Sequence, residues 1–475
     1  MKSEQSQTSV LNPDRYFDPD PTIRGIAREL FAEVKDLPII SPHGHTDPRW
    51  FAENTPFSDP ANLLITPDHY VFRMLYSQGL QLEDLGIARL DGKPVEHDPR
   101  KIWRLFAKYY YLFAGTPVGN WFDHIFQEVF GLTERFDENN AAEFYTLIER
   151  ALKTEDYLPR RIIERFNIEL IATTDQVTDT LEHHQAILDS GWKGRVIPTF
   201  RPDAVTDMLN PDWVNNIQLL GDVVGYELNS YQKYIQALED RRQFFKGLGA
   251  TSTDHGVMRP FTQSLTVNQA QKLFEKVLRG SVEPTEAQSF TAHMLMEMAR
   301  MSTEDGLVMQ IHPGSFRNHN KALFNLFGAD KGADIPIQTE YTQNLRQLLN
   351  TYGNDPHLKL IVFTLDESTY ARELAPLAAH YPALKLGPAW WFNDSIDGMT
   401  RFRQMTTETA SIYNTVGFND DTRALLSIPA RHDLSRRVDS NYLAGLVATH
   451  RIELQDAFNM GKALAYDLAK NTYNL

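Results

Sequence analysis

Short apolar runs, each followed by polar residues, recur along the chain and are typical of buried β-strands. Amphipathic patterns with helical spacing, such as residues 178–189 and 368–380, lie between most of them. Strands that alternate with helices predict a parallel sheet, and eight repeats predict an α/β fold, a distorted (β/α)8 TIM-type barrel. The eight runs cover residues 37–40, 168–172, 195–200, 250–253, 306–311, 358–365, 384–387 and 415–418.

The spacing of these runs is uneven at one place, between the first run and the second. Residues 101–113 and 140–152 lie there and have the apolar spacing of helices. A single crossover helix is far shorter than this stretch. We therefore predict a helical insertion at residues 57–156 that borders the active site, and a barrel formed by residues 1–56 and 157–475.

Composition and charge exclude several classes of protein. Apolar residues make up 42% of the chain and charged residues 23%, as in soluble globular proteins. The sequence has no run of 18 apolar residues and no secretory signal, so we expect no membrane partner. The formal charge of −15 argues against a nucleic-acid partner. The lack of cysteine excludes disulfides and suits a cytoplasmic location, and large barrels often form homo-oligomers.

Residue types that bind metals follow three of the predicted strands. His43 and His45 follow the first strand at alternate positions, which point the same way on an extended chain. His312 follows the fifth strand, and Asp421 follows the eighth. Because the carboxyl ends of barrel strands meet at one face, we expect these four residues to form a divalent-metal site. Each also has a simpler interpretation, as a loop histidine or, for Asp421, as a helix cap.

Further motifs accompany the paired histidines in a fixed order, from about residue 20 to the C-terminus. With these motifs the chain resembles uronate isomerase, a member of the amidohydrolase superfamily. The motifs are His43-x-His45, Asp68-His69-Tyr70, Thr173-Thr174-Asp175, Arg201-Pro202-Asp203, Asp254-His255, His312-x-Gly314-x-x-Arg317-Asn318, Trp390-Trp391-Phe392-Asn393-Asp394, Asp421-x-Arg423 and Arg431-His432.

The resemblance implies an enzyme that interconverts the aldose and ketose forms of a hexuronate. D-glucuronate and D-fructuronate are one such pair, and D-galacturonate and D-tagaturonate are another. The cofactor implied is one divalent metal ion, usually taken as zinc. His43, His45 and Asp421 would hold it, with His312 as an additional ligand. Catalytic roles would fall to Tyr70, Arg423, Asp254 and Asp421, and substrate contacts to His69, Arg201, Trp390, Trp391, His312 and Arg317.

The chemistry of the implied reaction is consistent with these residue types. Isomerisation moves a proton between C2 and C1 through an enediol, so negative charge on neighbouring oxygens needs stabilisation. An arginine can lower the pKa of an adjacent tyrosine, and we hypothesise that Tyr70, assisted by Arg423, carries the proton. Asp254 would accept the ring hydroxyl proton, and Arg201 would pair with the substrate carboxylate. Tyr70 could instead be a core aromatic, and Arg201 a loop anchor.

Several positions depart from the family pattern or invite another interpretation. Gly44 stands between the metal histidines, Gln176 follows Asp175, and Asp123-His124 lies in the insertion, so the preferred hexuronate stays open. Asp175 could cap the helix that follows it, and we expect His183-His184 to be a surface pair.

Two other functions compete with isomerisation. The first is an amidohydrolase-superfamily hydrolase or decarboxylase that acts on another small carboxylic acid, although no bridging lysine follows the fourth strand. The second is a non-catalytic sugar-acid sensor, which would be expected to have lost part of the metal-binding set. Metal content combined with turnover would separate all three functions.

Overall fold

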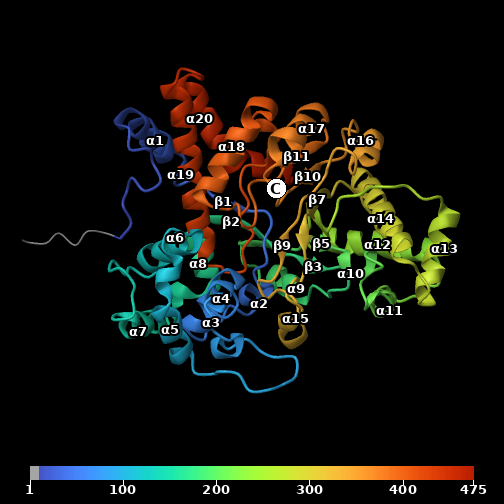
Figure 1. Ribbon diagram of the computed structural model, residues 1–475, viewed down its shortest axis with the longest axis horizontal. Coiled ribbons are helices and arrows are strands. Elements are labelled where there is room, and N and C mark those ends of the chain that lie inside the picture. Colours follow the sequence, from blue (N-terminus) through green and yellow to red (C-terminus); the bar gives the residue numbers. More distant parts are fainter. Residues whose placement is uncertain (1–9) are drawn as a thin grey trace, which may run out of the picture.

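Parallel strands lie at the centre of the molecule, and helices surround them (Figure 1). The computed structural model describes residues 10–475. Its strands are β1 Ile39–Ser41, β2 Ile168–Ala172, β3 Asp175–Gln176, β4 Arg195–Ile197, β5 Phe200–Arg201, β6 Ser252–Val257, β7 Val308–Pro313, β8 Ser315–Phe316, β9 Ile335–Pro336, β10 Leu360–Val362 and β11 Leu384–Leu386. One parallel sheet has the order β1-β2-β4, and the other has the order β11-β10-β7-β6-β5-β3. The pair β8-β9 is antiparallel.

The two parallel sheets are parts of one continuous wall. The second predicted strand corresponds to β2, and β3 continues it after a short gap; the third corresponds to β4, and β5 continues it in the same way. Backbone hydrogen bonds continue between the two halves, from Thr173 N to Ile197 O at 2.9 Å and from Asp175 N to Thr199 O at 3.0 Å. The strand order around the wall therefore follows the sequence, as in a (β/α)8 barrel.

The barrel closes through an irregular eighth segment. Within the described residues, the strand predicted at 415–418 is wrong in detail, because it is reduced to a parallel bridge between Thr415 and Leu386. Gly417 and Asp421 have φ angles of 78° and 42°, which turn the backbone away from an extended conformation. The N–H of His45 then donates to the carbonyl of Thr422 at 3.0 Å and joins the last segment to the first. The distorted barrel is thereby confirmed.

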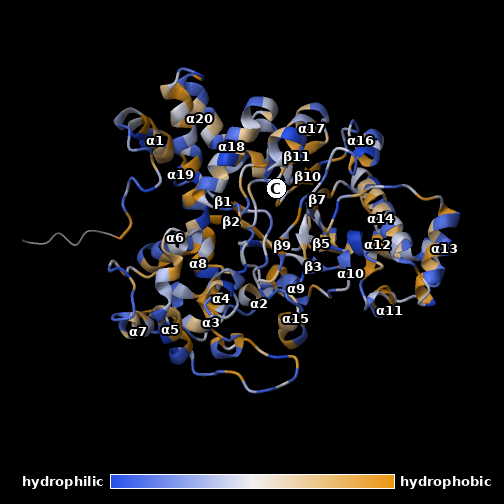
Figure 2. Ribbon diagram, viewed as in Figure 1, coloured by the Kyte–Doolittle hydropathy of each residue, from blue (hydrophilic) through white to orange (hydrophobic). Residues whose placement is uncertain are grey.

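Helices follow the strands as the alternating pattern predicts. Figure 2 shows that most of them carry both hydrophobic and hydrophilic residues, as helices packed on a core do. Within residues 10–475, no helix combines the length and apolar character needed to cross a lipid bilayer. These helices are α1 Pro21–Val34, α9 Glu182–Asp189, α10 Asp203–Thr206, α11 Trp213–Val224, α12 Tyr231–Gly247, α13 Val267–Leu278, α14 Pro284–Asp305, α15 Lys321–Phe327, α16 Arg346–Tyr352, α17 Ala375–His380, α18 Ile396–Ala410, α19 Ser427–Ala448, α20 Leu454–Lys462 and α21 Leu468–Thr472.

The stretch between β1 and β2 is helical, as the sequence predicts. Several of its helices begin at an Asp-Pro or Thr-Pro step. The side chain of the cap residue accepts a backbone N–H of the first turn, and the proline has no N–H that would need a partner. The division into barrel and insertion stays a prediction, because one buried cluster runs from Trp103 in the insertion to Ile171 in the barrel. The helices are α2 Pro48–Glu53, α3 Pro60–Leu64, α4 His69–Tyr76, α5 Pro99–Lys108, α6 Pro117–His124, α7 Ala141–Leu152 and α8 Pro159–Arg165.

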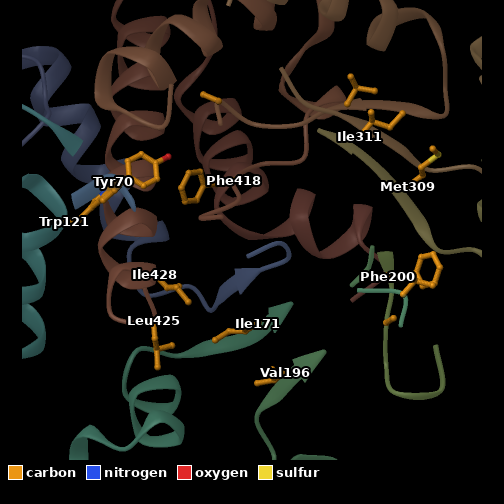
Figure 3. Packing of buried hydrophobic residues seen from close by; sticks show 14 of the residues in the cluster. Tyr70, Trp121, Ile171, Val196, Phe200, Met309, Ile311, Phe418, Leu425 and Ile428 are labelled. Atoms are coloured by element: carbon orange, nitrogen blue, oxygen red, sulfur yellow. The ribbon is translucent and has the colours of Figure 1, made fainter. Parts of the chain in front are cut away.

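The core joins the barrel wall to the insertion close to the ends of the strands. In Figure 3, Ile171 and Val196 extend from neighbouring strands, and Tyr70 of α4 lies against Trp121 of α6. The two aromatic rings meet edge to face with their centroids 5.4 Å apart. The insertion is therefore packed firmly enough to hold Tyr70 in a fixed position.

Candidate active site

A cavity of about 700 Å³ opens at the carboxyl ends of the strands. This is the end of a (β/α)8 barrel where functional side chains gather. Most of the residues predicted for the site line it, together with several aspartates. The predicted residues in its lining are His45, His69, Tyr70, Arg201, Arg317, Trp390, Trp391, Asp421 and Arg423.

The two histidines after β1 and the aspartate of the eighth segment converge. The Nε2 atoms of His43 and His45 lie 3.5 Å and 3.2 Å from Oδ1 of Asp421. One ligand atom from each of the three lies within 4.8 Å of the others, so the group could hold a metal ion. Asp421 caps no helix, because α19 begins only at Ser427 and its N-cap is Leu426.

His312 joins this group through its stacked ring. Its centroid lies 4.6 Å from that of His43, and its Nδ1 is 2.6 Å from Oδ1 of Asp254. His43, Asp254 and His312 form a second group with metal-ligand spacing. In the described part of the chain, Nε2 of His312, Nδ1 of His43 and Oδ1 of Asp421 are buried without a hydrogen-bond partner. Buried polar atoms are rarely left without partners, so this donor set fits a bound metal ion.

Electrostatics favours the protonation states that metal ligands need. Burial lowers the pKa of His45 and of His312, which favours the neutral form of both imidazoles. Although burial opposes it, the neighbouring His43 and His45 hold the pKa of Asp421 below its usual range. His312, followed by Arg201, likewise lowers the pKa of Asp254 against the effect of burial. Neutral imidazoles and an ionised carboxylate bind a cation without first losing protons.

Tyr70 is positioned by the start of α4. The side chain of Asp68 caps this helix by accepting the N–H of Tyr70 at 2.8 Å. The phenol donates to Oδ2 of Asp394 at 3.0 Å, and Nη1 of Arg431 donates to the same oxygen at 3.0 Å. Arg431 lies flat against Trp121, with its guanidinium carbon 3.5 Å from the ring centroid.

The expected pairing of Tyr70 with Arg423 is wrong in this structure. The arginine beside Tyr70 is Arg431, whereas Nη2 of Arg423 donates to Oδ2 of Asp330 at 3.0 Å. The expected direction of the pKa is also wrong. Burial, followed by the charge of Asp394, raises the pKa of Tyr70 well above its usual value. Without a ligand, Tyr70 is therefore a neutral phenol hydrogen-bonded to a carboxylate.

Arg201 is held at the end of β5 by two carboxylates. Its Nε donates to Oδ2 of Asp203 at 2.8 Å, and its Nη1 lies 3.5 Å from Oδ2 of Asp254. The backbone N–H of Gly256 fixes Asp203 through bonds of 3.2 Å and 3.0 Å to its two oxygens. A Cβ atom on Gly256 would lie 2.9 Å from both Nη2 of Arg201 and Oδ2 of Asp203. Glycine at this position thus allows the arginine to lie against β6.

The two tryptophans have different surroundings. The indole N–H of Trp390 donates to Oδ2 of Asp421, so this residue orients a candidate metal ligand rather than only packing. Trp391 contacts His69 edge to face, with centroids 5.4 Å apart. The guanidinium of Arg317 lies 5.9 Å from the ring of Trp391, and its Nη1 donates to Asp334 at 2.9 Å.

Two expectations about flanking residues are wrong. Asp175 caps no helix: it belongs to β3 and accepts a hydrogen bond of 2.7 Å from Thr173. His184 is not on the surface, because its Nε2 lies 2.8 Å from Oγ1 of Thr173 and the residue is buried. Thr173 therefore contacts both side chains, and Thr173 and Asp175 line the cavity.

The departures from the family pattern at Asp123-His124 and at Gly44 lie apart from the cavity lining. Asp123 bonds to Tyr110 at 3.4 Å inside the insertion, and His124 lines a separate groove. The carbonyl of Gly44 accepts a bond of 2.8 Å from Thr174, which supports the loop of the metal histidines.

Among the residues of the site to which sequence reasoning gave no role, three partner the predicted catalytic residues Tyr70 and Arg423. These are Asp394, Arg431 and Asp330. The first two belong to the motifs Trp390-Trp391-Phe392-Asn393-Asp394 and Arg431-His432, which was the available signal. Asp330 lies in no motif, and no local pattern connects it to Arg423.

Comparisons with known proteins agree over nearly the whole chain. The sequence profile of the glucuronate isomerase family matches residues 22–473. Uronate isomerase from Brucella canis is 57% identical over 98% of this chain and 100% of the relative. Glucuronate isomerase from Caulobacter crescentus has a crystal structure with 53% identity and a TM-score of 0.96, covering 98% of this chain and 97% of that one. The crystal structure of uronate isomerase from Thermotoga maritima has 27% identity and a TM-score of 0.91. It covers 98% of this chain and 99% of that one. This chain belongs to the glucuronate isomerase family.

Proposed function

We propose that this protein interconverts the aldose and ketose forms of a hexuronate, either D-glucuronate with D-fructuronate or D-galacturonate with D-tagaturonate. The observation that carries the proposal is the convergence of His43, His45 and Asp421 at an arginine-lined cavity, which His45 and Asp421 line. The 57% identity of this chain to a uronate isomerase, over the full length of that relative, supports the same reaction. The relatives described above are named as isomerases, which supports isomerisation over a hydrolase, a decarboxylase or a sensor.

The cofactor we propose is one zinc ion held by His43, His45 and Asp421, with His312 beside it. When bound, such an ion supplies positive charge that polarises a substrate carbonyl and stabilises negative oxygen. Asp254 fixes the imidazole of His312 through its 2.6 Å contact and thereby leaves the other ring nitrogen facing the site. Trp390 orients Asp421 from the opposite side through its indole N–H.

Tyr70 is our candidate for the proton carrier between C2 and C1. The buried phenol can pass its own proton to Asp394, take the C2 proton, and deliver a proton to C1 as the transfer reverses. The charge of Arg431 lies beside both groups and would stabilise the transient phenolate. In this scheme Arg423 contributes positive charge to the oxygens of the enediol.

Asp254 and Arg201 are proposed to act on the cyclic sugar and its carboxylate. The carboxyl group of Asp254 lies 2.6 Å from Nδ1 of His312 and 3.5 Å from Nη1 of Arg201, and as a carboxylate it would accept the ring hydroxyl proton. Arg201 would pair with the substrate carboxylate, which selects a uronic acid over a neutral sugar. His69, Trp391 and Arg317 would complete the substrate contacts.

Gly256→Ala tests the position of Arg201. The added methyl group must displace Arg201 or Asp203, so we expect the KM for D-glucuronate to rise by about tenfold, the loss of one charged hydrogen bond. Steady-state kinetics measures the change. Gly25→Ala in α1 is the matched control, because a Cβ there meets nothing within 4 Å. An unchanged KM in Gly256→Ala would argue against Arg201 as the carboxylate contact.

Proton NMR in heavy water tests the reaction itself. Zinc-loaded protein incubated with D-glucuronate or D-galacturonate should form the ketose, with altered C1 and C2 proton signals. The rates with the two sugars rank the substrates, and chelator-treated protein is the control. Silence with both sugars, from protein shown to contain metal, would contradict the proposed function.

A further inference from the structure

Asp330 places a carboxylate among the cationic side chains of the cavity. It lies in the segment between α15 and β9, and its Oδ2 accepts a hydrogen bond from Arg423 at 3.0 Å. Its Oδ1 lies 3.9 Å from Nη1 of Arg317. Asp330 also has a φ of 61°, a conformation that side-chain-bearing residues adopt infrequently. The segment is thus shaped so that this carboxylate faces the two arginines.

The ion pair of Asp330 differs from the one that its neighbour Asp334 makes. Asp334 is 4% exposed, accepts the N–H of Asn318 at 2.7 Å, and pairs with Arg317 at 2.9 Å. It therefore anchors the local backbone. In the pair between Asp330 and Arg423, the two side chains are 46% and 38% exposed, and both residues line the cavity. A pair so open to the cavity can be broken by a ligand without unfolding the segment.

The segment is held close to the helix that carries His69 and Tyr70. Gly332 packs against α4 so tightly that a Cβ on it would lie 2.7 Å from Cβ of Arg73 and 3.3 Å from the carbonyl of His69. Its φ of 69° likewise requires glycine. Asp330 is therefore fixed at the mouth of the cavity and does not extend freely into solvent.

The charge of Asp330 acts on Arg423, Arg317 and His69. Although burial opposes it, Arg423 and Arg317 lower the pKa of Asp330 to about 2, so it is ionised at neutral pH. Burial, followed by Arg423, lowers the pKa of His69 to about 3, and Asp330 counteracts that change. In the ligand-free protein, the carboxylate of Asp330 thus neutralises Arg423 in a cavity proposed to bind an anionic substrate.

We propose that Asp330 competes with the anionic substrate for Arg423, and that the incoming hexuronate takes over this arginine. The inference rests on the proposed function for the identity of the ligand. Asp330 then sets the affinity for uronic acids, because its negative charge must be approached and displaced on binding. A neutral sugar carries no carboxylate, so the charge of Asp330 does not repel it.

Asp330→Asn tests the competition. We expect the KM and the calorimetric Kd for D-glucuronate to fall about 3- to 10-fold, the scale of one partly exposed charge interaction. Binding of D-glucose, the neutral probe, should not change. Asp14→Asn is the matched control, because Asp14 makes an exposed ion pair with Arg28 outside the cavity lining. Metal content is measured in every preparation.

Each outcome decides between the alternatives. Weaker binding of D-glucuronate by Asp330→Asn would overturn the proposal and make Asp330 a contact for sugar hydroxyl groups. Equal affinities in the wild type and the variant would also overturn it, as would a matching change in Asp14→Asn. Tighter binding without turnover in any preparation would support the competition and refute the isomerase function instead.

Discussion

Asp421→Asn is expected to lose its metal ion and to reduce kcat by about 10³-fold or more, because a bound cation stabilises developing charge by several kcal/mol. Oδ1 of Asp421 faces the Nε2 atoms of His43 and His45, and its other oxygen accepts the indole N–H of Trp390. Asparagine keeps the volume but removes the charge that balances a divalent ion. Elemental analysis and steady-state kinetics measure the two effects.

Two comparisons give this result its meaning. Wild-type protein stripped with a chelator should show a similar loss of turnover, and zinc should restore it. The variant should not regain activity at the zinc concentration that restores the wild type. A variant with full metal content and near-normal kcat would remove Asp421 from the ligand set. The thermal transition of both proteins should be recorded without metal, so that folding and metal affinity are separated.

Tyr70→Phe is expected to reduce kcat by about 10²- to 10⁴-fold and to leave the metal content unchanged. Phenylalanine preserves the ring contacts with Trp121 and His69 and removes only the hydroxyl group. The hydroxyl is the group that reaches Asp394 at 3.0 Å. Loss of deuterium exchange at C1 and C2 in heavy water would locate the defect in proton transfer.

The control for this variant is Tyr110→Phe. Tyr110 is likewise a tyrosine bonded to an aspartate, Asp123, but it is only partly buried, and the pair lies within the insertion and does not line the cavity. The same atom is removed, so a general loss of stability would affect both variants. Near-normal turnover in Tyr70→Phe would exclude Tyr70 as the proton carrier, and the proton would then have to move by another group of the cavity.

The metal group could be predicted from the sequence because it depends on a general property of the fold. His43 and His45 share the two-residue period of an extended chain, and parallel strands end at a common face. Asp421 could be placed there by counting strands. The irregular eighth segment could not be predicted in the same way, since no local pattern signals the positive φ of Asp421 or the single bridge between Thr415 and Leu386.

The hydrogen-bond partners of Tyr70 and Arg423 could not be predicted from the sequence, for a different reason. Asp394 lies 324 residues from Tyr70 along the chain, so no local spacing connects them. Which arginine meets which carboxylate depends on how α4 and α19 pack. The predicted partner of Tyr70, Arg423, and its observed partner, Arg431, are both arginines, so residue type cannot tell them apart. Sequence motifs therefore identified which residues gather, while the pairings among them required the three-dimensional structure.

The hydrogen bond that joins His45 to Thr422 also bears on how the protein is made. Until the eighth segment has left the ribosome, the wall of strands has two open edges and the third metal ligand is missing. Pairings between distant segments form slowly, because a long loop must close first. We therefore expect the set formed by His43, His45 and Asp421 to become complete only after the eighth segment has been synthesised and has paired with the first.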